Sequence, residues 1–533
     1  MGVRFKHCGF LVIGLSWALA LLVLPAAQIA HAATFTVNTT NDTVDANPGD
    51  GICADANGAC SLRAAIREAN ALTGTDTVTV PAGVYTLTIA GAGEQQNATG
   101  DLDIRSSLDL VGAGAASTII QAGSSGGVSG DGIDRVLEVI GAITVNISDV
   151  TIRYGRLGSG AAGGGLSISS GGVVTLDECI VADNYVASTN FGGGGIFLFA
   201  GSLTIDNSAL VGNVHGNIGG GVFNDNGNPA IANAVIINNS TFSANSSGQG
   251  GAIASDGPLT LSNSTFYGNS ATTGGDIANN ASTVTLQNSI LAASSGGACT
   301  GFAGTSTNNL VSDGSCGIAA NAATNLDSTL ANNGGQTPTH ALLTSSNAID
   351  AGASNCPDNT ATPLVRDQRN YARPAGAGCD IGAFEANSTP LAVQLASFEA
   401  TNARDHVLIA WETVSELNNL GFNLYRGQTP DAPEAWLAFV PAQSPGSAPG
   451  AIYRWMDAGV AAGETYHYWL EDIDLSGAAT LHGPVSVTHE GPTAVAVTGF
   501  TAAGKPSVLP ALAALAAGLG VALAWSKRRL RPS

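Results

Sequence analysis

Hydrophobic and polar residues alternate in short runs through most of the chain. Six of these runs follow one template, with apolar ends around small or polar central positions. They are Ile147–Ile152, Leu176–Val181, Ile205–Leu210, Ile237–Phe242, Leu261–Phe266 and Leu286–Leu291. Alternation over a few residues is typical of half-buried β-strands and does not fit helical spacing. The pattern therefore predicts many short strands and an all-β chain.

The six runs recur at a nearly constant distance. Their third positions are Asp149, Glu178, Asn207, Asn239, Asn263 and Asn288, so the successive spacings are 29, 29, 32, 24 and 25 residues. Glycine-rich starts such as Gly193–Ile196 open a further strand between neighbouring runs. Periods of this size indicate a solenoid. We predict a right-handed, single-stranded parallel β-helix over residues 77–325, with about ten rungs roughly 4.8 Å apart.

Equivalent asparagines predict polar columns along this rod. Asn207, Asn239, Asn263 and Asn288 share one place in successive repeats, and a further Asn follows three residues after most runs, at Asn184, Asn213, Asn245 and Asn269. Amides stacked along the axis can hydrogen-bond to one another, which satisfies polar groups that a turn would otherwise bury. We expect structural ladders, with Asp149 and Glu178 as substitutions within one of them.

One amphipathic helix interrupts the strand pattern between Cys60 and Leu72. Its apolar face is expected to hold Leu62, Ala65, Ile66, Ala69 and Leu72, and its polar face Arg63, Arg67 and Glu68. Ser61 stands where an N-cap is needed. Because an open solenoid end exposes a strand edge, residues 33–76 are predicted to cap the rod.

Two apolar segments lie near the ends of the chain. The first, Phe10–Leu24, follows Arg4 and Lys6 and precedes Ala30-His31-Ala32, which predicts a cleaved signal peptide over residues 1–32. The second, residues 508–525, follows a linker (491–507) and precedes a basic tail (526–533), which predicts a transmembrane anchor with the tail in the cytoplasm. We expect an exported protein held at the cell surface or envelope, with the membrane as one partner.

Charge and cysteine content fit this location. The formal charge is −21, and the signal (+2) and tail (+4) account for +6, which leaves −21 − 6 = −27 on the rest of the chain. Such a surface repels nucleic acid, so no nucleic-acid partner is expected. In an oxidising compartment neighbouring cysteines pair. The expected disulfides are Cys53–Cys60, Cys299–Cys316 and Cys356–Cys379, with Cys179 as a buried free thiol.

The composition changes after residue 390. Glycine-rich repeats stop, and aromatic residues such as Trp411, Trp436 and Trp469 enter alternating runs between turn residues. About seven strands in a β-sandwich are predicted over residues 391–490. We interpret the aromatic residues as the sandwich core; a sugar-binding aromatic platform is the alternative.

Three stretches resemble known families. Residues Cys60–Ala71, "CSLRAAIREANA", resemble the CSLREA motif of bacterial exported β-helix proteins. Asn332–Gly352 and Asp367–Glu385 resemble the choice-of-anchor Q region that ends such β-helices, here residues 326–390. Val407–Gly427 resembles fibronectin-type-III-like modules of bacterial surface proteins. The resemblance implies fold and surface location but no activity, because these families are named for their architecture.

The positions of the charged residues limit the reactions that the predicted β-helix could catalyse. A lyase acting on uronates needs a base and cations beside the substrate carboxylate, yet no Lys or Arg occurs between Leu157 and Val365. A hydrolase needs converging carboxylates, for which the candidates are Asp103, Asp134, Asp149 and Asp183. No cofactor is predicted. Calcium stays open, although the acidic loop Asp42–Asp55 fails the EF-hand pattern.

We therefore expect a non-catalytic surface module for adhesion or surface structure that contacts glycans or other cell-surface molecules. The alternative is a carbohydrate-active β-helix enzyme, either a polysaccharide hydrolase or a lyase. A convergent, solvent-open carboxylate group beside a groove would favour the enzyme. Flat polar walls and carboxylates bound within ladders would favour the module.

Overall fold

The structure is a computed structural model that describes residues 32–158, 160–188, 191–227, 234–280, 283–358, 360–388, 394–403, 405–416, 419–443, 450–474 and 479–491. Within these ranges α1 (Leu62–Ala71) is the one α-helix, and strands form the rest of the regular structure. No helix in this part of the chain is long and apolar enough to span a membrane. The expected anchor and basic tail, and nearly all of the expected signal peptide and linker, lie outside the described residues.

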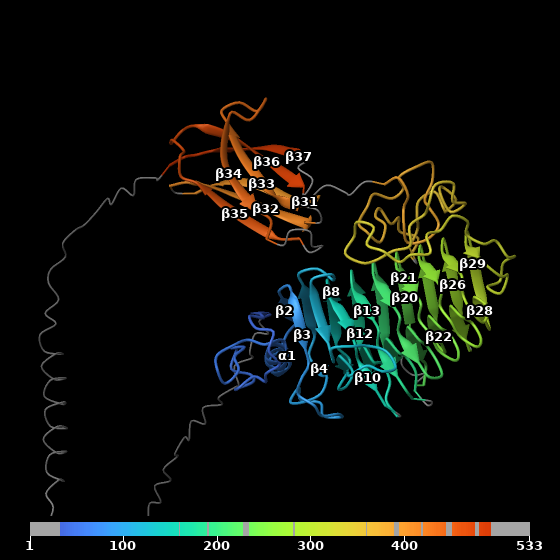
Figure 1. Ribbon diagram of the computed structural model, residues 1–533. Helices are drawn as coiled ribbons and strands as arrows, with labels where there is room; N and C mark the ends of the chain where they lie inside the picture. The colour runs from blue at the N-terminus through green and yellow to red at the C-terminus, as the bar shows by residue number, and fades with distance from the viewer. Residues whose placement is uncertain are drawn as a thin grey trace, which may run out of the picture.

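Three long parallel sheets form a β-helix, and the chain visits them in turn (Figure 1). Sheet A contains β1 (Thr34–Thr36), β2 (Asp76–Val80), β5 (Leu108–Gly112), β8 (Thr144–Ser148), β12 (Val173–Asp177), β16 (Ser202–Asp206), β20 (Ala234–Asn238), β23 (Leu259–Ser262), β26 (Val284–Gln287) and β29 (Gly304–Thr307). Its 10 strands agree with the predicted number of rungs.

Sheets B and C complete each rung. Sheet B contains β3 (Gly83–Thr86), β6 (Thr118–Gln121), β9 (Thr151–Arg153), β13 (Ile180–Ala182), β17 (Ala209–Val211), β21 (Thr241–Ser243), β24 (Thr265–Tyr267), β27 (Ile290–Ala292) and β30 (Leu310–Val311). Sheet C contains β4 (Leu102–Ile104), β7 (Leu137–Ile140), β11 (Leu166–Ser169), β15 (Ile196–Phe199), β19 (Val222–Asp225), β22 (Ile253–Ser255), β25 (Ile277–Asn279) and β28 (Cys299–Thr300). A short sheet D joins β10 (Arg156–Leu157), β14 (Tyr185–Val186) and β18 (Val214–His215).

The alternating pattern sorts side chains between the core and the outside of the rod. In sheet A, Leu176 pairs in register with Ile147 on one side and Ile205 on the other, and all three are buried. The residue before each of them points outward, and this outer column contains Asn146, Thr175, Thr204, Thr260 and Thr285, with Ile236 as an apolar member between Thr204 and Thr260. The predicted polar wall is therefore present on sheet A.

The column of third positions forms the corner between sheets A and B. Asp149, Glu178, Asn207, Asn239, Asn263 and Asn288 all have positive φ, between 47° and 59°. Asn and Asp tolerate this left-handed conformation better than other side-chain-bearing residues, which accounts for most of the column. The ladder expected at Asn207, Asn239, Asn263 and Asn288 is wrong in its contacts: among the described residues only Asn239 donates to its neighbour, to Asn207 Oδ1 at 3.4 Å. Asn263 instead donates to the carbonyl of Pro357, and Asn288 accepts from the amide of Ala353.

The second asparagine column forms the continuous ladder. The side-chain amides of Asn184, Asn213 and Asn245 donate in turn to Asn213, Asn245 and Asn269 at 2.9–3.0 Å. All four residues are fully buried. Each amide also donates to a backbone carbonyl of an earlier strand, as Asn245 does to Leu210. The ladder thus satisfies polar groups at a turn that has no access to water.

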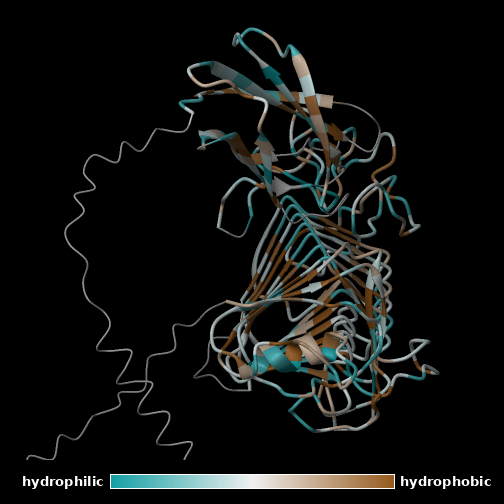
Figure 2. Cartoon of the chain, turned by 90° about the vertical axis from the view of Figure 1, so that its left-hand side faces the viewer, coloured by the Kyte–Doolittle hydropathy of each residue, from teal (hydrophilic) through white to brown (hydrophobic). Residues whose placement is uncertain are grey.

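Helix α1 lies across the N-terminal end of the rod, as predicted (Figure 2). Ser61 Oγ accepts from Ala64 N and caps it, and Leu62, Ala65, Ile66 and Ala69 are buried. The expected polar face is partly wrong, because Arg63 and Glu68 are buried as well. Arg63 pairs with Asp42, and Glu68 accepts from the backbone amides of Gly49 and Gly51. These contacts fold the acidic loop 42–55 onto the helix.

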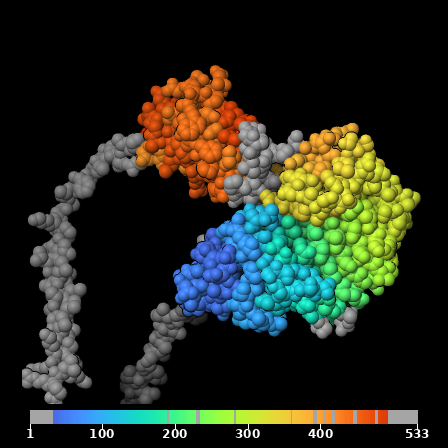
Figure 3. All heavy atoms as spheres, viewed as in Figure 1, coloured from blue at the N-terminus to red at the C-terminus, as the bar shows by residue number. Residues whose placement is uncertain are grey.

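The segment from residue 326 to 388 packs along the flank of the rod and not over its end. Its layer over the strands is visible in Figure 3 (yellow to orange). It covers the outer face of the later strands of sheet B, where Ile290 and Leu310 meet Leu342 and Ile381 in an apolar cluster. Arg373 forms a buried ion pair with Glu385 at 2.9 Å and donates to Asn239 on the corner column.

The remaining strands form a β-sandwich of two antiparallel sheets around one core. One sheet contains β31 (Gln394–Asn402), β32 (Val407–Ser415) and β35 (Ile452–Asp457). The other contains β34 (Ala435–Pro441), β33 (Asn419–Gly427), β36 (Thr465–Asp474) and β37 (Ala479–Thr488). Trp411, Phe422 and Tyr468 are buried in the shared core, whereas Trp436 is 59% exposed. The core interpretation therefore holds for most of the aromatic residues.

All three expected disulfides are present. Cys53–Cys60, Cys299–Cys316 and Cys356–Cys379 join their sulfurs, and Cys179 is a buried free thiol. The first disulfide precedes α1 directly, and the third lies within the flanking segment. The second disulfide ties the chain after β30 to β28 of the rod.

Candidate functional site

The outer face of sheet C changes from acidic to aromatic along the rod. The register of this sheet aligns Asp103, Glu138, Ser167, Phe197 and Phe223 in one outward column. These side chains point outward because their neighbours on each strand, such as Leu166 and Ile168 in β11, are fully buried in the core. Of the three long sheets, sheet B is covered by the flanking segment over β21, β24, β27 and β30, so sheets A and C offer the longer faces for contact with other molecules.

Three phenylalanines form an aromatic cluster on this face. The ring of Phe197 lies nearly parallel to that of Phe199, with centroids 6.3 Å apart, and meets Phe191 edge-on at 6.4 Å. Phe191 is 45% exposed and Phe199 is 36% exposed. On the following rungs Phe223, Ala254 and Ala278 continue the outward column of Phe197 and extend an apolar cluster that is separate from the rod core. Exposed apolar patches of this kind commonly mark binding surfaces.

A groove of about 260 Å³ joins the aromatic cluster to charged residues. Phe191, Phe197 and Phe199 line one part, and Arg135 and Glu138 line another. Ser167 and Ser169 from β11 and the glycine-alanine segment 160–162 complete the lining. The groove therefore offers aromatic faces, hydroxyl groups, a carboxylate and a guanidinium to a single ligand.

A carboxylate cluster adjoins the charged end of this groove. One oxygen each from Asp101, Asp103 and Glu138 lies within 4.8 Å of the others, so the three could hold a cation. Burial raises the pKa of Asp101 to about 8 and the pKa of Asp103 to about 7, since the charged forms lose their hydration. The guanidinium of Arg135 already lies 3.2 Å from Asp101 and 2.7 Å from Glu138. Arg135 therefore offsets part of the negative charge of the cluster, as a bound cation would do.

The structure separates the four predicted catalytic carboxylates. Asp103 and Asp134 both lie close enough to Asp101 for their charges to contribute to its raised pKa. Asp149 lies on the corner column, where burial and the Asp149 charge raise the pKa of Glu178. Asp183 follows β13, and its side chain is exposed. The four residues therefore do not form one catalytic group.

A second cavity, of about 310 Å³, lies between sheet A and the flanking segment. Asp177 and Asp206, in register on adjacent strands, face Asp358 and Arg366 across it. Burial, with a contribution from the charge of Asp177, raises the pKa of Asp206 to about 6. Each of the two strand carboxylates accepts from an asparagine of the next rung at 2.9 Å, Asp177 from Asn207 and Asp206 from Asn238. They are thus held within the polar columns of the rod.

The aromatic groove was not predicted from the sequence, although a local signal was present. In "GIFLF" at Gly195–Phe199 both strand faces are apolar, whereas the equivalent "GLSIS" of the preceding rung has serines at the outward positions. Phenylalanine in place of those serines indicates an outer surface that is suited to contact with another molecule and not only with water. No family model matches the chain, and no curated protein sequence matches it.

Proposed function

We propose that this chain is a bacterial cell-surface protein that binds glycans along the outer face of sheet C without cleaving them. The observation that carries the proposal is the groove in which Phe191, Phe197 and Phe199 stand beside Arg135 and Glu138. The apolar faces of sugar rings pack on aromatic rings, and sugar hydroxyls take hydrogen bonds from charged and hydroxyl side chains. A groove with both kinds of group suits a carbohydrate chain better than a purely apolar ligand.

The state of the carboxylates supports binding over catalysis. Asp103 is fully buried, and its backbone and one oxygen are held by Asn97. Arg135 pairs with Asp101 and Glu138, and asparagines hold Asp177 and Asp206. A glycosidase needs one carboxyl free to donate a proton and a second free to attack or to activate water. Glu138 in the groove is held by Arg135, and Asp177 and Asp206 in the flank cavity are each held by an asparagine, which argues against both roles.

The proposed location rests on sequence features. We place the mature protein outside the cell, after removal of a signal peptide and with residues 508–525 in the membrane. The disulfides agree with an oxidising compartment. The resemblance to CSLREA and choice-of-anchor Q proteins supports a right-handed β-helix on a surface protein, and the sandwich would serve as a fibronectin-type-III-like stalk.

The test measures retention of the purified full chain on a panel of immobilised neutral and acidic polysaccharides. Phe199→Ala and Phe191→Ala remove exposed rings at small cost to the core, and each should weaken binding roughly tenfold. Trp436→Ala is the matched control, because it removes an exposed ring from the sandwich and not from the groove. Binding that depends on Trp436 and not on the two phenylalanines would move the glycan site to the sandwich and reject the groove.

A glycan hydrolase is the second candidate, favoured by the raised pKa of Asp206 beside Asp177 in the flank cavity. The same panel is therefore assayed for new reducing ends and for unsaturated products, with and without calcium. Turnover that disappears in Asp177→Asn or Asp206→Asn, or in an Asn variant of Asp103, Asp134, Asp149 or Asp183, would replace the binding module with an enzyme. Retention without turnover supports the module.

A further inference from the structure

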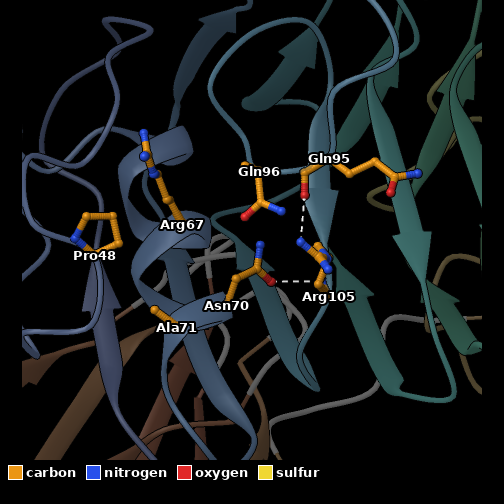
Figure 4. Close-up of a pocket in the computed structure, with 7 residues that line it drawn as sticks. All are labelled: Pro48, Arg67, Asn70, Ala71, Gln95, Gln96 and Arg105. Carbon is orange, nitrogen blue, oxygen red and sulfur yellow. Dashed lines mark hydrogen bonds between the residues drawn. The ribbon is translucent and has the colours of Figure 1, made fainter.

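A third open pocket, of about 350 Å³, lies where the capping helix meets the first rung of sheet C. Arg67 and Asn70 of α1 line one side, Gln95 and Gln96 line another, and Arg105 stands directly after β4 (Figure 4). The two arginines border the pocket from different elements. No carboxylate is among the residues that line it.

Hydrogen bonds fix the wall of this pocket. Asn70 accepts from the backbone amide of Arg105 at 2.7 Å and donates to the carbonyl of Asp103 at 2.6 Å. The guanidinium of Arg105 donates one bond, 3.0 Å long, to the carbonyl of Gln95 (Figure 4). A guanidinium has five N–H donors, so most of those on Arg105 stay available to a ligand.

Among the described residues of the rod, Arg67 and Arg105 carry their charge without an ion pair, as Arg153 and Arg156 also do, whereas other arginines are paired. Arg63, Arg135, Arg369 and Arg373 each pair with an Asp or Glu carboxylate. In the described ranges neither Arg67 nor Arg105 makes such an ion pair. Two unpaired guanidiniums at one pocket attract an anion, and their planar forks suit carboxylate and sulfate oxygens. The chain has a net negative charge, whereas this pocket is lined by two arginines and no carboxylate.

The pocket lies on the same face as the aromatic groove. Ile104 pairs with Val139, which pairs with Ile168, which pairs with Leu198. Arg105 follows Ile104 and therefore continues the outward column of Ile140, Ser169 and Phe199. Three rung spacings, roughly 14 Å, separate Arg105 from Phe199. A single oligosaccharide can reach both.

We propose that this pocket binds the acidic group, a carboxylate or a sulfate, of an oligosaccharide that lies along the outer face of sheet C. The inference rests on the proposed glycan binding and names its ligand class as acidic glycans. Phe191, Phe197 and Phe199 contact the sugar rings, and Arg67 and Arg105 select the charge. Neutral glycans bind the groove alone and bind more weakly.

The test compares two forms of one ligand by calorimetric titration of the full chain. One is a hexasaccharide of alternating glucuronic acid and N-acetylglucosamine, and the other is the same hexasaccharide with its carboxylates reduced to alcohols. The acidic form should bind roughly tenfold more tightly, since charge-assisted hydrogen bonds to arginine are worth about that factor or more. Arg105→Gln and Arg67→Gln should each lower the affinity for the acidic form towards that of the reduced form. Arg454→Gln, at an exposed arginine of the sandwich, should leave the preference unchanged.

Equal affinity for the two forms, or a preference that survives both arginine variants, would overturn the pocket. A sulfated neutral hexasaccharide distinguishes the two acidic groups. If it competes with the acidic hexasaccharide, the pocket binds sulfate as well as carboxylate. If it does not compete, the pocket binds carboxylates alone. If Phe199→Ala abolishes binding of both forms while the arginine variants change nothing, the aromatic groove binds the glycan and the pocket does not contribute. Binding of neither form at all, with the polysaccharide panel also negative, rejects the proposed function itself.

Discussion

The guanidinium of Arg63 lies 2.6 Å from the carboxylate of Asp42, and both side chains are closed off from solvent. The same guanidinium donates to the carbonyl oxygens of Gly100 and Asp101, at 2.7 and 3.0 Å. One arginine thus ties together α1, the N-terminal loop and the start of the first strand of sheet C. This contact joins the cap to the rod.

Arg63→Ala is expected to lower the stability of the rod by about 3–5 kcal/mol, because it leaves a buried carboxylate and two carbonyls without their donor. The matched control is Arg67→Ala, one turn further along the same helix, which should cost less than about 0.5 kcal/mol. The measurement is denaturant unfolding followed by far-ultraviolet circular dichroism. Tryptophan fluorescence serves as an internal reference, because every Trp lies outside residues 33–390. Equal losses in the two variants would contradict the assigned role of the ion pair.

The asparagine ladder predicts a second, separate effect on stability. Asn245 accepts from Asn213 and donates to Asn269 and to the Leu210 carbonyl, all within a fully buried turn. Asn245→Ala should therefore lower the free energy of unfolding by about 2–4 kcal/mol, since it leaves several buried polar groups without a hydrogen-bond partner. Asn146→Ala provides the control, because its amide bonds to Asp109 on the exposed face of sheet A. A loss in the control as large as that in Asn245→Ala would argue against the ladder.

The fold could be predicted because the apolar positions of each rung recur along the sequence at a nearly constant spacing. Each rung repeats the same apolar positions, so Leu176 or Ile205 could be assigned to the core without knowledge of its neighbours in space. The disulfides followed from short separations along the chain. The role of the corner asparagines could not be read in the same way. Both asparagine columns share one period, and only the backbone conformation distinguishes a residue with positive φ from a ladder member.

The candidate site was harder to predict because it depends on contacts across the sequence. Arg105 and Arg67 are 38 positions apart in a chain with few cations, and nothing local indicates that they border one pocket. The burial of Arg63 and Glu68 was missed for the same reason. Helical periodicity places both on a polar face, but the loop that covers that face comes from residues 42–51.

The buried carboxylates predict that the rod loses stability as the pH rises. In the folded chain burial raises the pKa of Asp103 to about 7 and that of Asp101 to about 8, whereas both titrate near 3.8 when unfolded. Between about pH 4 and pH 8 the folded state therefore binds more protons, and the free energy of unfolding falls as the pH increases.

Asp103→Asn removes one of these protons and keeps the shape of the side chain. Its unfolding free energy should fall less steeply between pH 5 and pH 8 than that of the unmodified chain, by at least about 1 kcal/mol over this range. Asp131→Asn is the control, because Asp131 is bonded to Ser124 and Ser125 and its pKa is lowered, so it stays charged throughout this window. Identical slopes for Asp103→Asn and the unmodified chain would show that Asp103 is ionised at neutral pH.

The attachment of the flanking segment to the rod should depend on Arg373, one of two buried arginines in that segment. Arg373 pairs with Glu385, donates to Asn239 on the rod and donates to the Gly382 carbonyl at 2.6 Å. Arg373→Ala should open residues 326–388 often enough to raise their cleavage rate by protease at least roughly tenfold. Cleavage is read on reducing gels, since the Cys356–Cys379 disulfide holds cut pieces together. Arg156→Ala, at an exposed arginine of the rod, should leave the cleavage rate unchanged.

The single thiol of the rod gives a test of both burial and export. Cys179 is fully buried, and burial raises its pKa, so iodoacetamide should not alkylate it in the native protein. After denaturation without reductant, Cys179 should react, because the other six described cysteines are paired. Cys8 lies in the expected signal peptide. Mass spectrometry of the alkylated chain should therefore find one modified cysteine if the signal is removed and two if it is retained. Alkylation of Cys179 in the native protein would mean that the rod opens at the rung that contains β12 and β13.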